Sequence, residues 1–271
     1  DGIGEEVMSA AVKVMKHVAE RFNMEIETTE ALMGGCSYEE YGTPLTDETI
    51  KICKDADAVL LGAWTPIPKN LFSILDIGAG TGVLALMLAQ RTSAQQIDAI
   101  EIDEDAYEEC VDNFENSPWS DRLFCYHAGL DEFLEEMEDE SYDLIISNPP
   151  FYTDEYKSDT KKRNLARFED ALPFEELIES AANLLSEFGI FSVIIPFKEE
   201  KRFIQLASEF QLHPFKTTRV KGNETSEIKR SLLAFTWDEQ INVVDELVIE
   251  MNRHQYTNEY IELTKEFYLK M

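Results

Sequence analysis

Residues 73–90 read Ser-Ile-Leu-Asp-Ile-Gly-Ala-Gly-Thr-Gly-Val-Leu-Ala-Leu-Met-Leu-Ala-Gln, and this stretch decides the fold. A short apolar strand runs into a turn that carries Gly78, Gly80 and Gly82. The Leu, Ala and Met residues that follow have high helix propensity, so they predict a helix directly after the turn. A strand, a glycine turn and a helix in this order are typical of the nucleotide-binding corner of an open α/β sheet.

The spacing of the three glycines separates two kinds of ligand. It reads G-x-G-x-G, whereas the dinucleotide fingerprint places its third glycine one position later, where this chain has Val83. Asp76 stands just before the turn, where a carboxylate would repel a pyrophosphate. A cationic group suits it better, such as the amino group of S-adenosylmethionine beside its sulfonium. We therefore predict that Asp76, Gly78, Gly80 and Gly82 bind that cofactor.

A second strand with an acidic end follows, Ile97-Asp-Ala-Ile-Glu-Ile-Asp103. Glu101 lies 19 residues after Gly82, which is the distance at which a carboxylate on the next strand holds ribose hydroxyls. The third strand ends in His127-Ala-Gly-Leu-Asp131. Asp131 lies too far along to match an acid that would bind the adenine amine of the cofactor, so we expect a backbone contact from Ala128 or Gly129 there.

A rigid corner ends a later apolar run, Asp143-Leu-Ile-Ile-Ser-Asn-Pro-Pro-Phe151. Two successive prolines fix φ and remove two N–H donors, which leaves their neighbouring carbonyl groups free to accept hydrogen bonds. The Asn148 side chain adds another carbonyl, and Phe151 adds a flat aromatic face. Such a corner fits a planar group that carries an –NH2. We predict that Asn148, Pro149 and Phe151 are the catalytic residues.

From about Asp57 to Met271 the chain resembles the class I, Rossmann-like methyltransferases, and within them the bacterial valine-tRNA adenine-N6 methyltransferases. The resemblance implies S-adenosylmethionine-dependent methyl transfer to the N6 amine of an adenine in tRNA, near the anticodon. It also assigns the roles given above to Asn148, Pro149 and Phe151. The matching motifs are Val59-Leu-Leu-Gly-Ala-Trp64, Leu75-Asp-Ile-Gly-Ala-Gly-Thr-Gly82, Ala99-Ile-Glu-Ile-Asp103, Ser147-Asn-Pro-Pro-Phe151 and Tyr256-Thr-Asn-Glu-Tyr-Ile-Glu-Leu-Thr-Lys-Glu-Phe-Tyr-Leu269.

The first 63 residues resemble a different family, the start of 3-isopropylmalate dehydrogenase. The two resemblances meet at Asp57-Ala-Val-Leu-Leu-Gly-Ala63, which fits both families, so we interpret the chain as a chimera of residues 1–56 and 57–271. The catalytic residues of the dehydrogenase lie beyond the matching part. We expect residues 1–56 to contribute nothing to catalysis. The other matching motifs are Asp1-Gly-Ile-Gly-Glu-Glu-Val-Met8, Ala31-Leu-Met-Gly-Gly35 and Gly42-Thr-Pro-Leu-Thr-Asp-Glu-Thr49.

Just before residue 57, where the two resemblances meet, the chain departs from the methyltransferase pattern. These methyltransferases resemble one another in a Lys-Val-Gly-Thr-Asp stretch that helps to close the cofactor site. Here that place reads Cys53-Lys-Asp-Ala-Asp57, and only the final Asp is retained. The resemblance therefore implies that this chain binds its cofactor less tightly than the family does, or that it has lost activity.

The net charge of −30 is unusual for a protein that binds RNA, because such proteins carry a basic face. An RNA substrate would require local basic patches on this acidic chain. The position directly after the Asn-Pro-Pro-Phe corner favours the first of two candidate groups for phosphate contact. The first group is Lys157, Lys161, Lys162, Arg163 and Arg167, and the second is Lys216, Arg219, Lys221, Lys229 and Arg230.

Other features of the composition set limits on the class of protein. No apolar run is long enough to span a membrane, and no secretory signal is present, so we expect a cytoplasmic protein. The four cysteines lack C-x-x-C spacing, which favours reduced, packed thiols. The four histidines form no metal-ligand spacing, and we predict no metal site. The oligomeric state is left open.

The pattern of elements predicts an α/β fold with an N-terminal α/β appendage, and the resemblance implies that this fold is of the Rossmann-like methyltransferase class. Five strands separated by helices imply a parallel sheet, and a closing hairpin adds an antiparallel seventh strand. We expect strands near 58–61, 73–77, 97–102, 122–127, 142–147, 189–195, 215–220 and 231–237, with an extra strand near 246–250. Helices are expected near 5–22, 46–54, 83–91, 104–115, 131–137, 174–186, 198–210 and 256–270.

The sequence also has features of three other functional classes. A protein-glutamine methyltransferase would use the same corner, since an amide –NH2 presents the same chemical problem, and the acidic chain suits it. A catalytically weak chimera that binds the cofactor is the second alternative. A dehydrogenase, the third alternative, is disfavoured because the catalytic residues of that family lie beyond the matching part.

The glycine spacing generates a first prediction. S-Adenosylmethionine or its demethylated product should raise the melting temperature of the chain, because each fits the turn behind Asp76, and NAD should not. A thermal-shift assay with the three ligands at equal concentration measures this. A shift with NAD alone would contradict the assignment of the cofactor.

Overall fold

The computed structural model describes residues 57–137, 140–149, 172–252 and 255–268. All of them belong to the second of two units into which the chain divides, Asp1–Ala56 and Asp57–Met271. Phe151, the first basic group and the predicted elements before residue 57 lie outside the described residues. No helix in the described part is long and apolar enough to cross a membrane.

A nine-stranded sheet in the order β3-β2-β1-β4-β5-β7-β6-β8-β9 forms the centre of this unit. The first five strands in that order are parallel, and β7 lies antiparallel between β5 and β6, so the predicted parallel sheet and closing hairpin are confirmed. The strands are β1 (Ser73–Ile77), β2 (Gln96–Glu101), β3 (Leu123–His127), β4 (Tyr142–Ser147), β5 (Leu185–Pro196), β6 (His213–Asn223), β7 (Ile228–Thr236), β8 (Val243–Asn252) and β9 (Gln255–Tyr256).

Two strands extend the sheet beyond the predicted seven. β8 contains the extra strand expected near 246–250, and it pairs with β6 in parallel. β9 is a two-residue strand that pairs antiparallel with the end of β8. The hydroxyl oxygen of Thr257 then caps the last helix by accepting a hydrogen bond from the Tyr260 N–H, so this helix begins at Asn258, two residues later than predicted.

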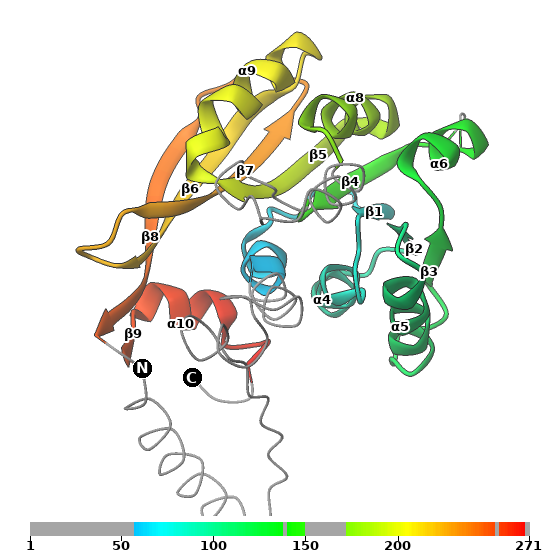
Figure 1. The fold of residues 1–271 in the computed structure, drawn as a ribbon, viewed down its shortest axis with the longest axis horizontal. Coiled ribbons are helices and arrows are strands. Elements are labelled where there is room, and N and C mark those ends of the chain that lie inside the picture. Colours follow the sequence, from blue (N-terminus) through cyan, green and yellow to red (C-terminus); the bar gives the residue numbers. More distant parts are fainter. Residues whose placement is uncertain (1–56, 138–139, 150–171, 253–254, 269–271) are drawn as a thin grey trace, which may run out of the picture. The chain divides into compact units, whose positions relative to one another are not determined.

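Helices cover both faces of the sheet, which gives three layers (Figure 1). One face carries the 57–64 helix, α4, α5 and α10, and the other carries α6, α8 and α9. The helices are α4 (Val83–Arg91), α5 (Glu104–Glu115), α6 (Leu130–Glu136), α8 (Phe174–Leu184), α9 (Glu200–Glu209) and α10 (Asn258–Thr264), and a short 3-10 helix, η2 (Phe197–Glu199), precedes α9.

Residues 57–64 are helical, so the strand predicted at 58–61 is wrong. A short apolar run does not by itself distinguish a buried strand from a buried helix. Tertiary contacts favour the helix here, because one of its faces packs on the sheet. Leu61 is fully buried, and the Trp64 indole N–H donates to the Thr218 hydroxyl over 2.7 Å.

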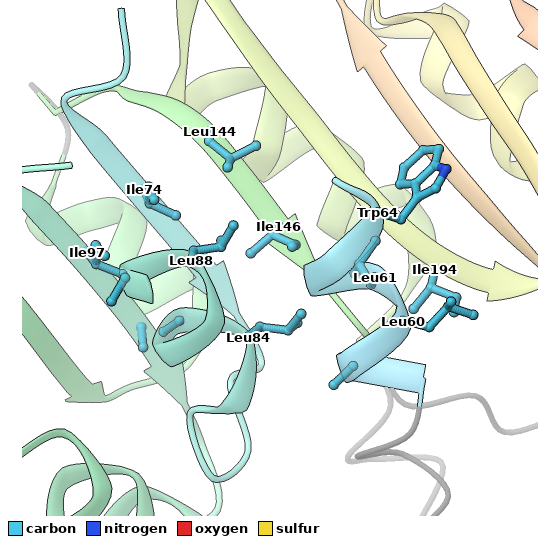
Figure 2. Close-up of a cluster of buried hydrophobic side chains, with 14 of the residues drawn as sticks. Leu60, Leu61, Trp64, Ile74, Leu84, Leu88, Ile97, Leu144, Ile146 and Ile194 are labelled. Atoms are coloured by element: carbon cyan, nitrogen blue, oxygen red, sulfur yellow. The ribbon is translucent and has the colours of Figure 1, made fainter. Parts of the chain in front are cut away.

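The core on this face joins the 57–64 helix to the parallel strands (Figure 2). Leu60, Leu61 and Trp64 lie toward Ile194 of β5, while α4 contributes Leu84 and Leu88. The remaining labelled side chains of this core come from the central strands β1, β2 and β4, namely Ile74, Ile97, Leu144 and Ile146. The 57–64 helix is therefore part of the hydrophobic core of this unit.

Leu61→Ala should destabilise the chain by about 2–5 kcal/mol, because it leaves a cavity beneath the 57–64 helix. Urea unfolding measures the change in the free energy of unfolding. Ile241→Ala is the matched control, since that side chain is 88% exposed and its loss should cost less than about 0.5 kcal/mol. Equal effects of the two substitutions would show that the helix does not contribute to the cooperative core.

Candidate active site

The parallel pairing of β1 with β4 brings the glycine turn and the Asn-Pro corner to the same edge of the sheet. Ile77 at the end of β1 is paired with Ser147 at the end of β4, and the Ser147 hydroxyl donates to the Ile77 carbonyl over 2.8 Å. The next helix after β1 leads to β2 on one side, whereas β4 and β5 lie on the other side. Ligands of open α/β sheets bind at such a switch point in the strand order.

The glycine turn has a left-handed backbone at all three glycines, with φ of +72°, +57° and +82° at Gly78, Gly80 and Gly82. A side chain at Gly82 would also collide with Phe114, whose Cε1 would lie 2.5 Å from the added Cβ. At Gly78 and Gly80 no atom of the described chain lies within 4 Å of such a Cβ. The turn is thus packed against α5 at Gly82 and open at the other two glycines.

Asp76 is fully buried beneath the turn. Its Oδ2 accepts a hydrogen bond from the Ala85 N–H over 3.2 Å, whereas its Oδ1 has no hydrogen-bond partner among the described residues. Burial, only partly offset by the Ala85 hydrogen bond and reinforced by the nearby charge of Glu101, raises the pKa of Asp76 to about 8. A buried carboxylate that has no positively charged partner among the described residues favours a cationic ligand, since such a ligand supplies the missing positive charge.

Glu101 is at the end of β2, as predicted, and its carboxylate binds backbone N–H groups of the chain itself. Oε2 accepts from Gly80 over 2.7 Å, and Oε1 accepts from Ile102 and Asp103 over 2.9 Å each. A carboxylate has about four lone-pair sites, so these bonds leave capacity for one further donor. Glu101 therefore joins the end of β2 to the glycine turn and can still accept from a hydroxyl.

Sequence reasoning missed an apolar side chain at this edge, Ile102, which is 68% exposed between two acids. Ile102 lies near the end of β3, since its carbonyl oxygen is 3.1 Å from Nε2 of His127, the last residue of that strand. The His127 ring stacks on Tyr107 with centroids 5.1 Å apart. The signal in the sequence is a lone Ile between two acids at the end of a predicted strand, Glu101-Ile102-Asp103.

The structure also places Asp131 closer to the site than the sequence suggested. The Asp131 side chain, in the first turn of α6, folds back over Gly129. A Cβ added to Gly129 would lie only 2.8 Å from Asp131 Oδ1. The same added atom would lie 4.0 Å from Ile102 Cδ1. Gly129, Asp131 and Ile102 are therefore neighbours.

The Asn-Pro corner begins directly after β4, with Asn148 half-buried and Pro149 buried. Ser147 precedes it and is fully buried. The corner is thus anchored by the strand and by the Ser147–Ile77 hydrogen bond, one strand away from the glycine turn. Phe151 lies outside the described residues.

The second basic group is largely engaged with acids and an aromatic ring of the chain. Arg219 pairs with Glu200, Lys221 pairs with Glu246, and Arg230 pairs with Asp57, at N–O distances of 2.7, 2.6 and 2.8 Å. Lys216 Nζ lies 4.3 Å from the centroid of the Trp64 ring. These contacts favour a mainly structural role for this group.

Two observations agree with S-adenosylmethionine as the ligand of this edge. The unpartnered Oδ1 of Asp76 matches a cationic amino group, and the open backbone at Gly78 and Gly80 allows a ligand to approach the turn closely. Glu101 adds an acceptor for a hydroxyl. The residues present therefore fit this cofactor.

Comparison with known proteins gives two family matches. The methyltransferase small domain family matches residues 58–219, and the isocitrate/isopropylmalate dehydrogenase family matches residues 1–76. The chain is 66% identical over 235 residues to the tRNA1(Val) (adenine(37)-N6)-methyltransferase of Flavobacterium psychrophilum, covering 87% of this chain and 99% of the relative. It is 68% identical over 216 residues to the enzyme of the same name from Flavobacterium johnsoniae, covering 79% and 92%.

Solved structures show the same fold. A protein from Agrobacterium tumefaciens described as a predicted O-methyltransferase superposes with a TM-score of 0.61 at 17% identity, covering 76% of this chain and 95% of that one. A methyltransferase from Pyrococcus furiosus has a TM-score of 0.50 at 19% identity, covering 86% and 98%. At these identities the likeness supports the Rossmann-like methyltransferase fold.

Asp76→Asn should stabilise the chain at pH 8 and change its stability little below pH 4. The folded carboxyl keeps its proton up to about pH 8, whereas the unfolded one loses it near 3.8, so wild-type stability falls as the pH rises between these values. The gain at pH 8 should be of the order of a few kcal/mol. Urea unfolding at pH 4, 6 and 8 measures it, with the exposed Asp238→Asn as control. Identical midpoints of wild type and Asp76→Asn at pH 8 would contradict it.

Proposed function

This chain belongs to the family of the tRNA1(Val) (adenine(37)-N6)-methyltransferases, and we propose that it transfers a methyl group to the N6 amine of an adenine in tRNA. One observation carries the proposal. The buried Asp76 with its glycine turn and the Asn148–Pro149 corner lie on neighbouring parallel strands, β1 and β4. A cofactor site and an acceptor for an amine are thereby adjacent.

S-Adenosylmethionine supplies a methyl group on a positively charged sulfur when it is bound. Asp76 would hold its amino group, for which the free Oδ1 is the supporting observation. Glu101 would accept from a ribose hydroxyl while it keeps its bond to the Gly80 N–H. Ile102 would cover one face of the cofactor's adenine, since it is the exposed apolar side chain beside Gly129.

The adenine amine is a poor nucleophile because its lone pair is delocalised into the ring. The side-chain oxygen of Asn148 and the carbonyl of Pro149 would each accept one N–H, which favours a pyramidal nitrogen with its lone pair directed at the methyl group. This is catalysis by positioning and by electrostatic stabilisation. Ser147 supports it, because its bond to Ile77 fixes the corner relative to the cofactor site. Phe151 would stack on the base once the base leaves its own stack.

The division of labour within the chain is also part of the proposal. Residues 57–271 would carry out catalysis, and residues 1–56 would take no part in it. Phosphate contacts are assigned to the first basic group, because it follows the corner directly in sequence while most of the second group is engaged within the chain. The first group is Lys157, Lys161, Lys162, Arg163 and Arg167.

The direct test is methyl transfer from labelled S-adenosylmethionine to total tRNA, compared with a protein extract as acceptor. Label should enter tRNA at adenine N6. Incorporation into glutamine side chains of protein, with none in tRNA, would replace this proposal with the protein-glutamine alternative.

Asn148→Ala should lower kcat by about 10²–10³-fold while leaving cofactor affinity nearly unchanged, because its carbonyl contributes most when the amine becomes tetrahedral. Initial rates with tRNA and calorimetric cofactor binding measure the two quantities. Asn116→Ala, at the residue directly after α5, is the control for loss of an exposed Asn. Equal losses of binding and turnover would mean that the corner has only a structural role.

A further inference from the structure

An aromatic ring and a guanidinium form a pair at the edge where β5 ends. Phe197 is the first residue of η2, directly after β5, and its side chain is half-buried. The Arg219 guanidinium carbon lies 5.5 Å from the centroid of the Phe197 ring, in cation–π contact. Neither residue contributes to the catalytic steps described above.

This pair lies on the substrate side of the candidate site. Ser147 of β4 is paired with Val193 of β5, so β5 runs beside the Asn148–Pro149 corner. It stays paired with β7 as far as Pro196, directly before Phe197. The cofactor residues Asp76 and Glu101 are on the other side of β4, on β1 and β2. A group that approaches the corner from the β5 side therefore passes Phe197.

A buried carboxylate fixes the orientation of the guanidinium. Glu200 is 4% exposed. Its carboxylate accepts hydrogen bonds from Nε and Nη2 of Arg219 over 3.1 and 2.7 Å, and from the Ser231 hydroxyl over 2.6 Å. Burial alone would raise the pKa of Glu200, but these hydrogen bonds hold it below its ordinary value, so the carboxylate is charged at neutral pH. A two-point contact of this kind sets the plane of the guanidinium as well as its position.

We propose that Phe197, with Arg219 held against it, is a stacking platform for a nucleobase adjacent to the target adenine in the tRNA strand. The inference rests on the proposed function, because it presumes an RNA substrate at the Asn148–Pro149 corner. When the target base leaves its stack, its neighbour loses a stacking partner. An aromatic ring or an Arg plane replaces that partner, as is common where proteins bind unstacked RNA.

The charge of the chain makes this form of recognition favourable. With 54 acidic and 24 basic residues, it has little capacity for general attraction to phosphates. Stacking on an aromatic face needs no net positive charge. The Arg219–Glu200 pair is close to neutral as a unit, so the platform does not depend on a basic surface.

Variants of Phe197 in the full chain test the platform. Phe197→Ala and Phe197→Leu should weaken binding of a valine-tRNA transcript about 5- to 150-fold, and Phe197→Tyr should keep most of the affinity because it keeps the ring. Fluorescence anisotropy with S-adenosylhomocysteine present measures this affinity. The matched control is Phe188→Ala. Phe188 lies near the start of β5, whereas Phe197 follows the end of β5, and the Phe188 side chain is 78% exposed. This variant should bind tRNA like wild type. Cofactor affinity should be unchanged in all four variants.

Two further transcripts identify the stacked base, each abasic on one side of the target adenine. With one of them the difference in affinity between wild type and Phe197→Ala should disappear, since the partner of the ring is gone. The platform is overturned if Phe197→Leu binds like wild type, if Phe197→Ala binds like Phe188→Ala, or if neither abasic transcript removes the difference. A wild type that methylates tRNA under any of these results leaves the proposed function standing. A wild type that neither binds nor methylates tRNA overturns both.

Discussion

The parallel pairing of β1 with β4 is the constraint on which the candidate site depends. The two strands are far apart in sequence, yet Ile77 and Ser147 are paired at their ends and joined by the Ser147 hydroxyl. Beyond this pair the chain continues into the glycine turn after β1 and into the Asn148–Pro149 corner after β4. The space between them is therefore defined by backbone hydrogen bonds of the sheet, which are rigid compared with contacts between loops.

The acids around the glycine turn show how the site is prepared for a ligand. Asp76 is buried with one oxygen unpartnered in the described part of the chain, which is unfavourable for the free protein. Glu101 instead satisfies three backbone N–H groups and connects the turn to β2. One carboxylate thus holds the turn in shape, and the other stores an unmet interaction that a cationic ligand can satisfy. Local rules of stability fail at functional sites in this way.

In the part of the sheet formed by β6, β7 and β8, basic side chains form ion pairs within the chain. Arg219, Lys221 and Arg230 are paired with acids, and the Arg230–Asp57 pair joins β7 to the start of the 57–64 helix. These cations mainly fix elements relative to one another.

The sequence by itself determined strands β1 to β8 and the α-helices from residue 73 onward, though not β9 or η2. It also determined their α/β order, the glycine turn and the positions of Asp76, Glu101 and Asn148 at strand ends. These features depend on local spacing, and local spacing is visible in a single chain. Only the tertiary structure decided that residues 57–64 are helical, that Glu101 bonds Gly80, that Ile102 is exposed beside Gly129, and that Phe197 meets Arg219. The physical reason is that each of these depends on strand register and on partners distant in sequence, which propensity and periodicity do not encode.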